Sequence, residues 1–173
     1  MTQTRLLVTV IFISLSIAAT AQAGSVEIIG KVCVIDGDSV IVGGERDAEG
    51  WCRGPIEARL DGIDAPEWDQ ACTRTDGSSW PCGGAAKQSL IEMAQDRATV
   101  CAATARGYYG RPLATCSVPG SGNLAEQLVR VGLALATSSR YRNIQNEDKT
   151  AKRGIWSGTF VKPSTWRKQK RNR

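Results

Sequence analysis

The chain has 173 residues with a formal net charge of +5, and it contains no histidine. The absence of histidine excludes Ser-His-Asp and Cys-His catalysis, so proton transfer in any hydrolase must use a carboxylate, a lysine, a tyrosine or metal-bound water. Basic residues crowd the C-terminal end, at Arg167, Lys168, Lys170, Arg171 and Arg173. Such a basic C-terminal end could bind a polyanionic partner or could be a solvated tail. Taken alone, the run of charges favours the solvated tail.

The first 23 residues predict a secretory signal peptide. Arg5 is their only charge, an apolar run follows from Leu6 to Ala19, and Ala21-Gln22-Ala23 supplies the small residues of a cleavage site. A buried N-terminal helix is the alternative interpretation. Cleavage after Ala23 predicts an exported protein, periplasmic or secreted, with no membrane span because no second apolar run of spanning length follows.

The remaining chain has the length of one domain with its own core. We expect that domain at residues 24–160, a basic C-terminal tail at residues 161–173, and a monomer. Along the chain, alternating and β-branched segments predict five strands, at Val26–Val34, Ser39–Val42, Ile56–Ile63, Ala98–Ala103 and Pro112–Val118. Apolar spacing and capping residues predict three helices, at Gly84–Gln95, from the N-cap Asn123 to Val131, and at Asn146–Arg153.

These elements predict an α+β fold that is mainly β. Five short strands with about three packed helices fit a partly open Greek-key barrel of the OB type. The glycine-rich segments Gly43–Pro55 and Trp68–Gly83 are predicted to be loops.

Six cysteines in an exported chain predict disulfides in an oxidising compartment. Fifteen pairings are possible, and the sequence alone does not select one. Cys72 with Cys82 would close a short loop, and Cys101 and Cys116 fall on neighbouring predicted strands. We prefer these two pairs, which leaves Cys33 to pair with Cys52. Zinc is the competing interpretation, but the chain has neither a Cys-x-x-Cys pair nor a histidine.

Three short motifs together specify a chemistry. They are Val34-Ile35-Asp36-Gly37-Asp38-Ser39, Arg59-Leu60-Asp61-Gly62-Ile63-Asp64-Ala65-Pro66-Glu67 and Tyr109-Gly110-Arg111. Each alone has an ordinary structural explanation, since Asp-Gly is a hairpin signal and the others fit strand ends or turns. Together they supply carboxylates for a hard cation, one further carboxylate for acid–base work and two arginines for a phosphate.

In this arrangement the chain resembles the staphylococcal (micrococcal) nuclease or thermonuclease family, exported bacterial branch. Further matching segments are Asn123-Leu124, Leu128–Ala134 and Arg153-Gly154-Ile155-Trp156. The resemblance implies an OB-fold enzyme that hydrolyses DNA and RNA with Ca²⁺ and leaves 3′-phosphates.

By position, the resemblance assigns Asp38 and Asp64 as calcium ligands, with Ala65 contributing only its backbone carbonyl. It assigns Glu67 as the general base, and Arg59 and Arg111 as the phosphate-binding arginines. Calcium accepts oxygen ligands in irregular geometry, which suits two carboxylates, a carbonyl and waters. Pro66 prevents a helix, so Glu67 is expected to lie near the metal without binding it.

The chain also departs from the family pattern. Gly107 occupies a position that is usually Asp, and Ser138 and Arg140 replace a base-stacking tyrosine pair, with Tyr141 as a neighbour. Two functional alternatives remain: a non-catalytic nucleic-acid-binding module of the same fold, and a disulfide-linked envelope protein whose basic tail touches anionic surfaces. The retained carboxylates and arginines favour the enzyme.

Overall fold

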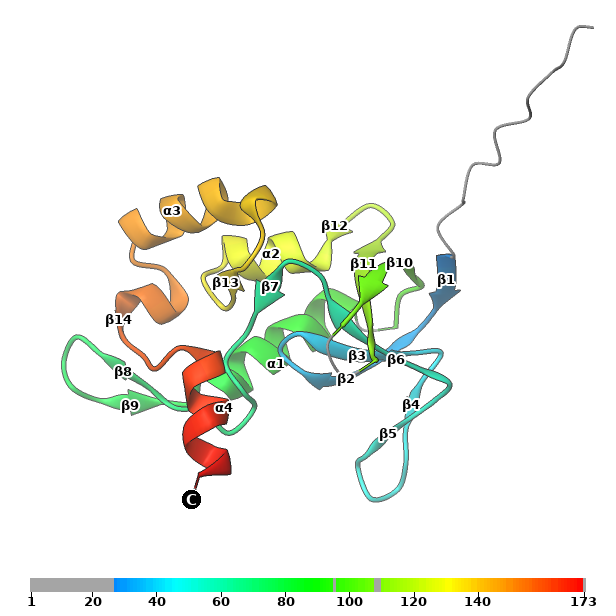
Figure 1. The fold of residues 1–173 in the computed structure, drawn as a ribbon, viewed down its shortest axis with the longest axis horizontal. Coiled ribbons are helices and arrows are strands. Elements are labelled where there is room, and N and C mark those ends of the chain that lie inside the picture. Colours follow the sequence, from blue (N-terminus) through cyan, green and yellow to red (C-terminus); the bar gives the residue numbers. More distant parts are fainter. Residues whose placement is uncertain (1–26, 95, 108–109, 173) are drawn as a thin grey trace, which may run out of the picture.

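The computed structural model describes residues 27–94, 96–107 and 110–172, and its largest element is a seven-stranded sheet (Figure 1). Six strands have the order β1-β10-β11-β6-β3-β2, and β12 pairs with β11. Only the β11–β6 pair is parallel. The strands are β1 (Glu27–Gly30), β2 (Val32–Asp36), β3 (Ser39–Val42), β6 (Ile56–Leu60), β10 (Thr99–Arg106), β11 (Pro112–Val118) and β12 (Gly122–Asn123).

The sheet contains the predicted strands with three differences. The strand expected at Ala98–Ala103 runs from Thr99 to Arg106. The strand expected at Val26–Val34 is divided at Lys31, because β1 pairs with β10 whereas β2 pairs with β3. The strand expected at Ile56–Ile63 ends at Leu60, where a turn leads into β7 (Ile63–Asp64). The pairings among the described residues do not close the sheet into a barrel, so the five-stranded Greek-key topology stays a prediction.

Short strands occupy both segments that were predicted to be loops. β4 (Glu45–Arg46) and β5 (Cys52–Arg53) form a hairpin that projects from the sheet (Figure 1). β8 (Cys72–Arg74) pairs with β9 (Ser79–Trp80) and also with β14 (Gly158–Thr159), while β13 (Leu135–Ala136) pairs with β7. The pairing with β14 brings the C-terminal segment onto the loop after Glu67.

The structure has four α-helices rather than about three among the described residues. The predicted N-cap of α2 is confirmed, since Asn123 Oδ1 accepts a hydrogen bond from the Glu126 N–H at 3.0 Å. The helix predicted at Asn146–Arg153 begins four residues earlier, because its buried positions include polar Gln145 and Asp148 and its apolar pattern is weak. The helices are α1 (Cys82–Ala94), α2 (Leu124–Arg130), α3 (Arg142–Thr150) and α4 (Pro163–Arg171).

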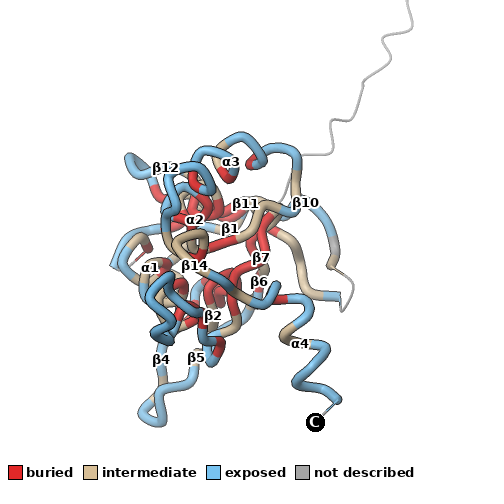
Figure 2. The backbone as a smooth tube through the Cα atoms, turned by 90° about the vertical axis from the view of Figure 1, so that its left-hand side faces the viewer, coloured by how far each residue is buried: buried red, intermediate tan, exposed pale blue. Residues whose placement is uncertain are grey.

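The core lies between the sheet and the helices α1 and α2. Figure 2 shows the buried segments gathered in the middle of the molecule, while α4 and the β4–β5 hairpin are mainly exposed. Side chains such as Val40, Leu60, Leu90 and Leu128 are at most 1% exposed. This packing fixes the ends of β2, β3 and β6, where the polar motifs lie.

Three disulfides join Cys33 to Cys52, Cys72 to Cys82 and Cys101 to Cys116, which confirms the preferred pairing. The described chain has no free cysteine. Disulfides of this density are typical of proteins outside the reducing cytosol.

The segment expected to be a solvated basic tail contains the helix α4. Pro163 is buried at its first turn, a position that proline favours. Gln70, itself 1% exposed, donates a hydrogen bond to the Val161 carbonyl oxygen at 2.6 Å, and Lys170 forms an ion pair with Asp69. These contacts hold α4 against the loop that follows Glu67.

The predicted signal peptide and Tyr109 lie outside the described residues. Within the described part of the chain, no helix is long and apolar enough to cross a bilayer.

Candidate functional site

The turn between β2 and β3 carries the first acidic motif. Gly37 lies so close to its neighbours that an added Cβ would come within 2.8 Å of Ala86 Cβ and 2.9 Å of Ala65 Cβ. This close approach presses the turn onto α1 and onto the segment after β7. Asp38 is therefore 3% exposed, and its Oδ2 accepts a hydrogen bond from the Ala65 N–H at 3.0 Å.

Two carboxylates face one shared point. Arg59 Nη2 lies 2.6 Å from Asp38 Oδ2 and 2.7 Å from Asp64 Oδ1. β6 supplies Arg59, and the Asp61-Gly62 turn brings Asp64 back beside it on β7. The predicted calcium ligands Asp38 and Asp64 are thus brought together around a cationic atom.

Glu67 lies at the edge of the same site. Its backbone is fixed by α1, because a Cβ on Gly83 would come within 1.6 Å of the Glu67 carbonyl oxygen. Gln70 N–H also donates to that oxygen at 2.7 Å. The Glu67 side chain is 24% exposed, so it is open to a small molecule in the site.

Arg167 on α4 contacts two carboxylates of the second motif. Its Nη1 lies 2.6 Å from Glu67 Oε1, and its Nη2 lies 3.0 Å from Asp64 Oδ1. The side chain is one-third exposed. A residue from the predicted tail therefore lies in direct contact with the predicted base and with a predicted metal ligand.

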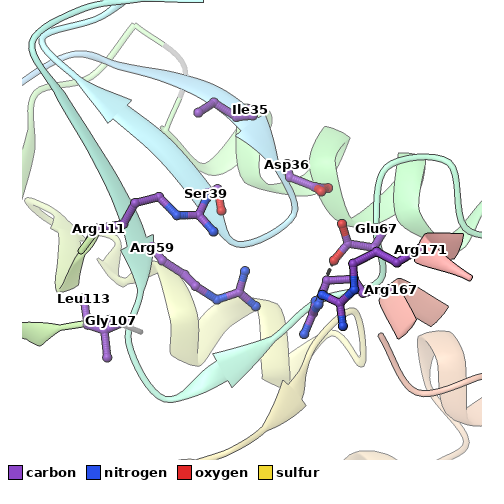
Figure 3. Close-up of a pocket in the computed structure, with 10 residues that line it drawn as sticks. All are labelled: Ile35, Asp36, Ser39, Arg59, Glu67, Gly107, Arg111, Leu113, Arg167 and Arg171. Atoms are coloured by element: carbon purple, nitrogen blue, oxygen red, sulfur yellow. Dashed lines mark hydrogen bonds and ion pairs between the residues drawn. The ribbon is translucent and has the colours of Figure 1, made fainter. Parts of the chain in front are cut away.

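A cavity of about 410 Å³ is lined by Arg59, Glu67 and Arg167, while Asp38 and Asp64 lie behind Arg59 and are not among its lining residues. In Figure 3, Arg59 and Arg111 extend into it from one side, and Glu67 lies opposite them beside Arg167 and Arg171. Arg111 Nη1 forms an ion pair with Glu57 Oε1 at 2.7 Å, and both side chains are 41% exposed. Arg111 is thus at the cavity wall, and its carboxylate partner differs from the two that Arg59 contacts.

Burial makes the acidic groups of the turn costly to ionise. It raises the pKa of Asp38, an effect that Arg59 partly offsets. Burial, together with the charges of Glu67 and Asp38, raises the pKa of Asp36 to about 6. A cation beside these carboxylates would lower both pKa values, because it favours their charged forms.

The donor set fits a hard cation only if protein backbone or water completes it. Among the residues that the structure describes, no group of three or more acidic, cysteine or histidine side chains is arranged to hold a metal. Asp38 and Asp64 offer the oxygen ligands that calcium accepts, but Arg59 Nη2 contacts both of them here, so an ion shared by the two carboxylates would displace the guanidinium. Ala65 is 2% exposed, and its N–H donates to Asp38 Oδ2.

Sequence reasoning missed three residues that line the cavity: Asp36, Arg167 and Arg171. Asp36 belongs to the first acidic motif, but the sequence assigns it no individual role. Arg167 and Arg171 are four residues apart after Pro163, and this spacing places them on one face of a helix that begins with proline. That pattern was the available signal, but it does not say what the helix contacts.

The residues that depart from the family pattern lie both in the cavity and away from it. Gly107 lines the cavity and adds no charge to it. Ser138 and Arg140 lie near the start of the short helix before α3, and Tyr141 is only 1% exposed. Tyr141 therefore cannot offer a ring face to a nucleotide base.

Comparison with known proteins decides the family. A family model described as staphylococcal nuclease homologue matches residues 57–158. This chain belongs to the staphylococcal nuclease family. The match contains Arg59, Asp64, Glu67 and Arg111, and it ends before α4.

Individual relatives cover more of this nuclease-family chain. An "uncharacterized endonuclease" of Escherichia coli O157:H7 is 31% identical over 151 residues, covering 83% of this chain and 88% of that protein. The "succinoglycan biosynthesis protein ExoI" of Rhizobium meliloti (strain 1021) is 31% identical over 143 residues, covering 79% of this chain and 69% of that protein. Family membership implies the OB fold and supports nuclease activity in general.

Proposed function

We propose that this protein is an exported, Ca²⁺-dependent phosphodiesterase that hydrolyses DNA and RNA and releases 3′-phosphate products. The observation that carries the proposal is the single cavity in which Glu67 and Arg111 meet the Arg59 guanidinium, which contacts both Asp38 and Asp64. Such a cavity contains acceptors for a cation and for a proton, and donors for a phosphate.

Asp38, Asp64 and the Ala65 carbonyl would hold the calcium ion. Calcium bound there would act as a Lewis acid toward a phosphate oxygen. What supports this assignment is the convergence of the two carboxylates and the raised pKa of Asp38, which an added positive charge would lower again.

Glu67 would accept the proton of the attacking water. Its carboxylate is partly exposed to the cavity, and its backbone is fixed by the close contact with Gly83. The 2.6 Å contact with Arg167 holds one carboxylate oxygen and leaves the other for the water. A carboxylate held in this way is ready for general-base work without a histidine.

Arg59 and Arg111 would bind the phosphate, each by forked hydrogen bonds to its oxygens. Negative charge grows on these oxygens in the transition state, and donors placed around them stabilise it. Arg59 would then exchange part of its contact with Asp38 and Asp64 for the phosphate. Arg111 reaches the cavity from the exposed Glu57 pair, so its exchange requires little desolvation.

The boundaries of the functional unit follow from the same contacts. Because Arg167 contacts Glu67, we extend the nuclease unit beyond residue 160 to include α4. We retain the cleaved signal peptide at residues 1–23, the periplasmic or secreted location and the monomeric state as parts of the proposal, with the disulfides in support of export. The proposed barrel treats β1 and β2 as one strand bent at Lys31.

The alternative is a binding module of the same fold that holds nucleic acid without cutting it. One assay separates the two. The oxidised mature protein is incubated with plasmid DNA and with RNA, in calcium or in chelator. We expect degradation of both substrates in calcium only, with 3′-phosphate ends. A gel shift without cleavage in either condition would contradict the enzyme and support the binding module.

A further inference from the structure

Two exposed tryptophans line one cavity. Trp51 is 66% exposed and Trp68 is 62% exposed, and both border a cavity of about 440 Å³. Large apolar side chains on the surface of a monomer are informative when they gather in one place. The apolar face of this cavity therefore calls for a ligand with a flat apolar surface.

This tryptophan cavity adjoins the proposed active site. Ile35 lines both cavities, and Trp68 directly follows Glu67 in the chain. Glu57, which holds Arg111, also borders the tryptophan cavity. A nucleotide next to a phosphate in the active site would thus be within reach of the tryptophan rings.

Trp51 is held in place although it is exposed. It ends the loop of the β4–β5 hairpin, where its N–H donates to Asp47 Oδ1 at 2.6 Å. Arg46 donates to the Gly50 and Val34 carbonyl oxygens at 2.6 and 3.1 Å, and the next residue, Cys52, is bonded to Cys33. These contacts fix the backbone that carries Trp51, so little backbone entropy is lost when a ligand stacks on its ring.

The charges around the cavity suit an anionic strand. Arg46 and Lys87 border it, and the one carboxylate that borders it, Glu57, is paired with Arg111. Aromatic faces with neighbouring cations are how proteins bind single-stranded nucleic acid, because bases stack on the rings and phosphates lie near the charges. A second copy of the chain that bound here through the same surface would place its own Arg46 and Lys87 against those of the first copy, and these like charges would repel.

We propose that the tryptophan cavity is a stacking subsite for an unpaired base next to the cleaved phosphate. The inference deepens the proposed function and rests on it. Bases in a duplex are already stacked on their neighbours, so the subsite favours single-stranded DNA, RNA and unpaired ends. It also supplies a base contact that the buried Tyr141 does not.

Binding without cleavage tests the proposal. In a Glu67→Gln background and in chelator, fluorescence anisotropy measures the affinity for a labelled single strand and for a duplex. We expect Trp51→Ala and Trp68→Ala each to weaken single-strand binding by about 5-fold to 100-fold, and duplex binding by less than about 2-fold. Trp51→Tyr is expected to restore most of the affinity.

Ile29→Ala is the matched control, because Ile29 is 68% exposed on β1 and does not border the cavity. It should bind like the parent. Unchanged single-strand affinity in both tryptophan variants would overturn the stacking subsite alone. Failure of the Glu67→Gln parent to bind any nucleic acid, in calcium as well as in chelator, would overturn the proposed function too.

Two further measurements sharpen the result. The Cys33→Ser/Cys52→Ser double variant, if its circular dichroism is native, should weaken single-strand binding in the same direction because the hairpin is released. Sedimentation velocity of the parent and of Trp51→Ala should give the same monomer. A parent dimer that Trp51→Ala dissociates, with single-strand affinity unchanged, would replace the subsite with an interface between two copies.

Discussion

Glu67→Gln is expected to lower kcat by about 10²-fold to 10⁴-fold, the usual contribution of a general base. The amide keeps the shape of the side chain but does not accept a proton at neutral pH. It can still accept the hydrogen bond that Arg167 donates at 2.6 Å, so α4 should remain in place. KM should change little, because the lost interaction acts in the transition state. Initial rates on a defined oligonucleotide in calcium provide the measurement.

Glu92→Gln is the control for this variant. Glu92 is an exposed carboxylate on α1 that accepts a hydrogen bond from Gln88, and it does not line the active-site cavity. Its kcat should equal that of the parent. A kcat for Glu67→Gln within about 3-fold of the parent would rule out Glu67 as the base.

Arg59→Lys is expected to lower kcat/KM by about 10²-fold, although the charge is conserved. A lysine ammonium offers no planar fork, so it cannot replace the guanidinium that contacts Asp38 and Asp64 and is proposed to bind the phosphate. Steady-state kinetics on the same oligonucleotide, with thermal unfolding to confirm a native fold, provide the measurement.

Arg130→Lys is its matched control. Arg130 also forms an arginine–carboxylate pair, with Glu126 at 2.6 Å, but on the exposed face of α2. Exposed pairs of this kind contribute little, so both activity and stability should be close to the parent. If Arg59→Lys turned over within about 3-fold of the parent, a difference of about 0.7 kcal/mol, the forked contact would have no role in catalysis.

The family resemblance assigned the acidic half of the site, and local structure explains why its carboxylates converge. Asp38 lies in the turn between β2 and β3, and Asp64 follows the turn after β6. β3 and β6 pair directly, with Ser39 opposite Arg59, so the register of this strand pair sets the distance between the motifs. Strand pattern and turn chemistry together therefore determine which carboxylates converge.

The basic half could be predicted only in part. Arg167 is 100 residues from Glu67 in the chain, and its position depends on the docking of α4 through Gln70, Lys170 and β14. No local sequence pattern predicts any of these contacts. A run of basic residues alone indicates a solvated tail, and only the packed loop after Glu67 converts it into a wall of the cavity.

The cysteines show the same division. Cys101 and Cys116 are directly opposite each other on β10 and β11, so recognising two neighbouring strands was enough to pair them. Cys33 and Cys52 were paired by elimination, because the β4–β5 hairpin inside a glycine-rich segment was not recognised. Long-range docking of irregular segments is the part of this fold that the sequence pattern does not contain.

Calorimetric titration of the folded, oxidised protein with calcium tests the central claim most directly, namely that Asp38 and Asp64 share one divalent ion. We expect one ion per chain in the parent. Affinity should fall by about 10-fold or more in Asp38→Asn and in Asp64→Asn, because each loses a charged ligand. Asp76→Asn, which alters an exposed turn carboxylate, should bind like the parent. The account would be contradicted if the folded parent took up no calcium, or if both site variants bound it as tightly as the parent does.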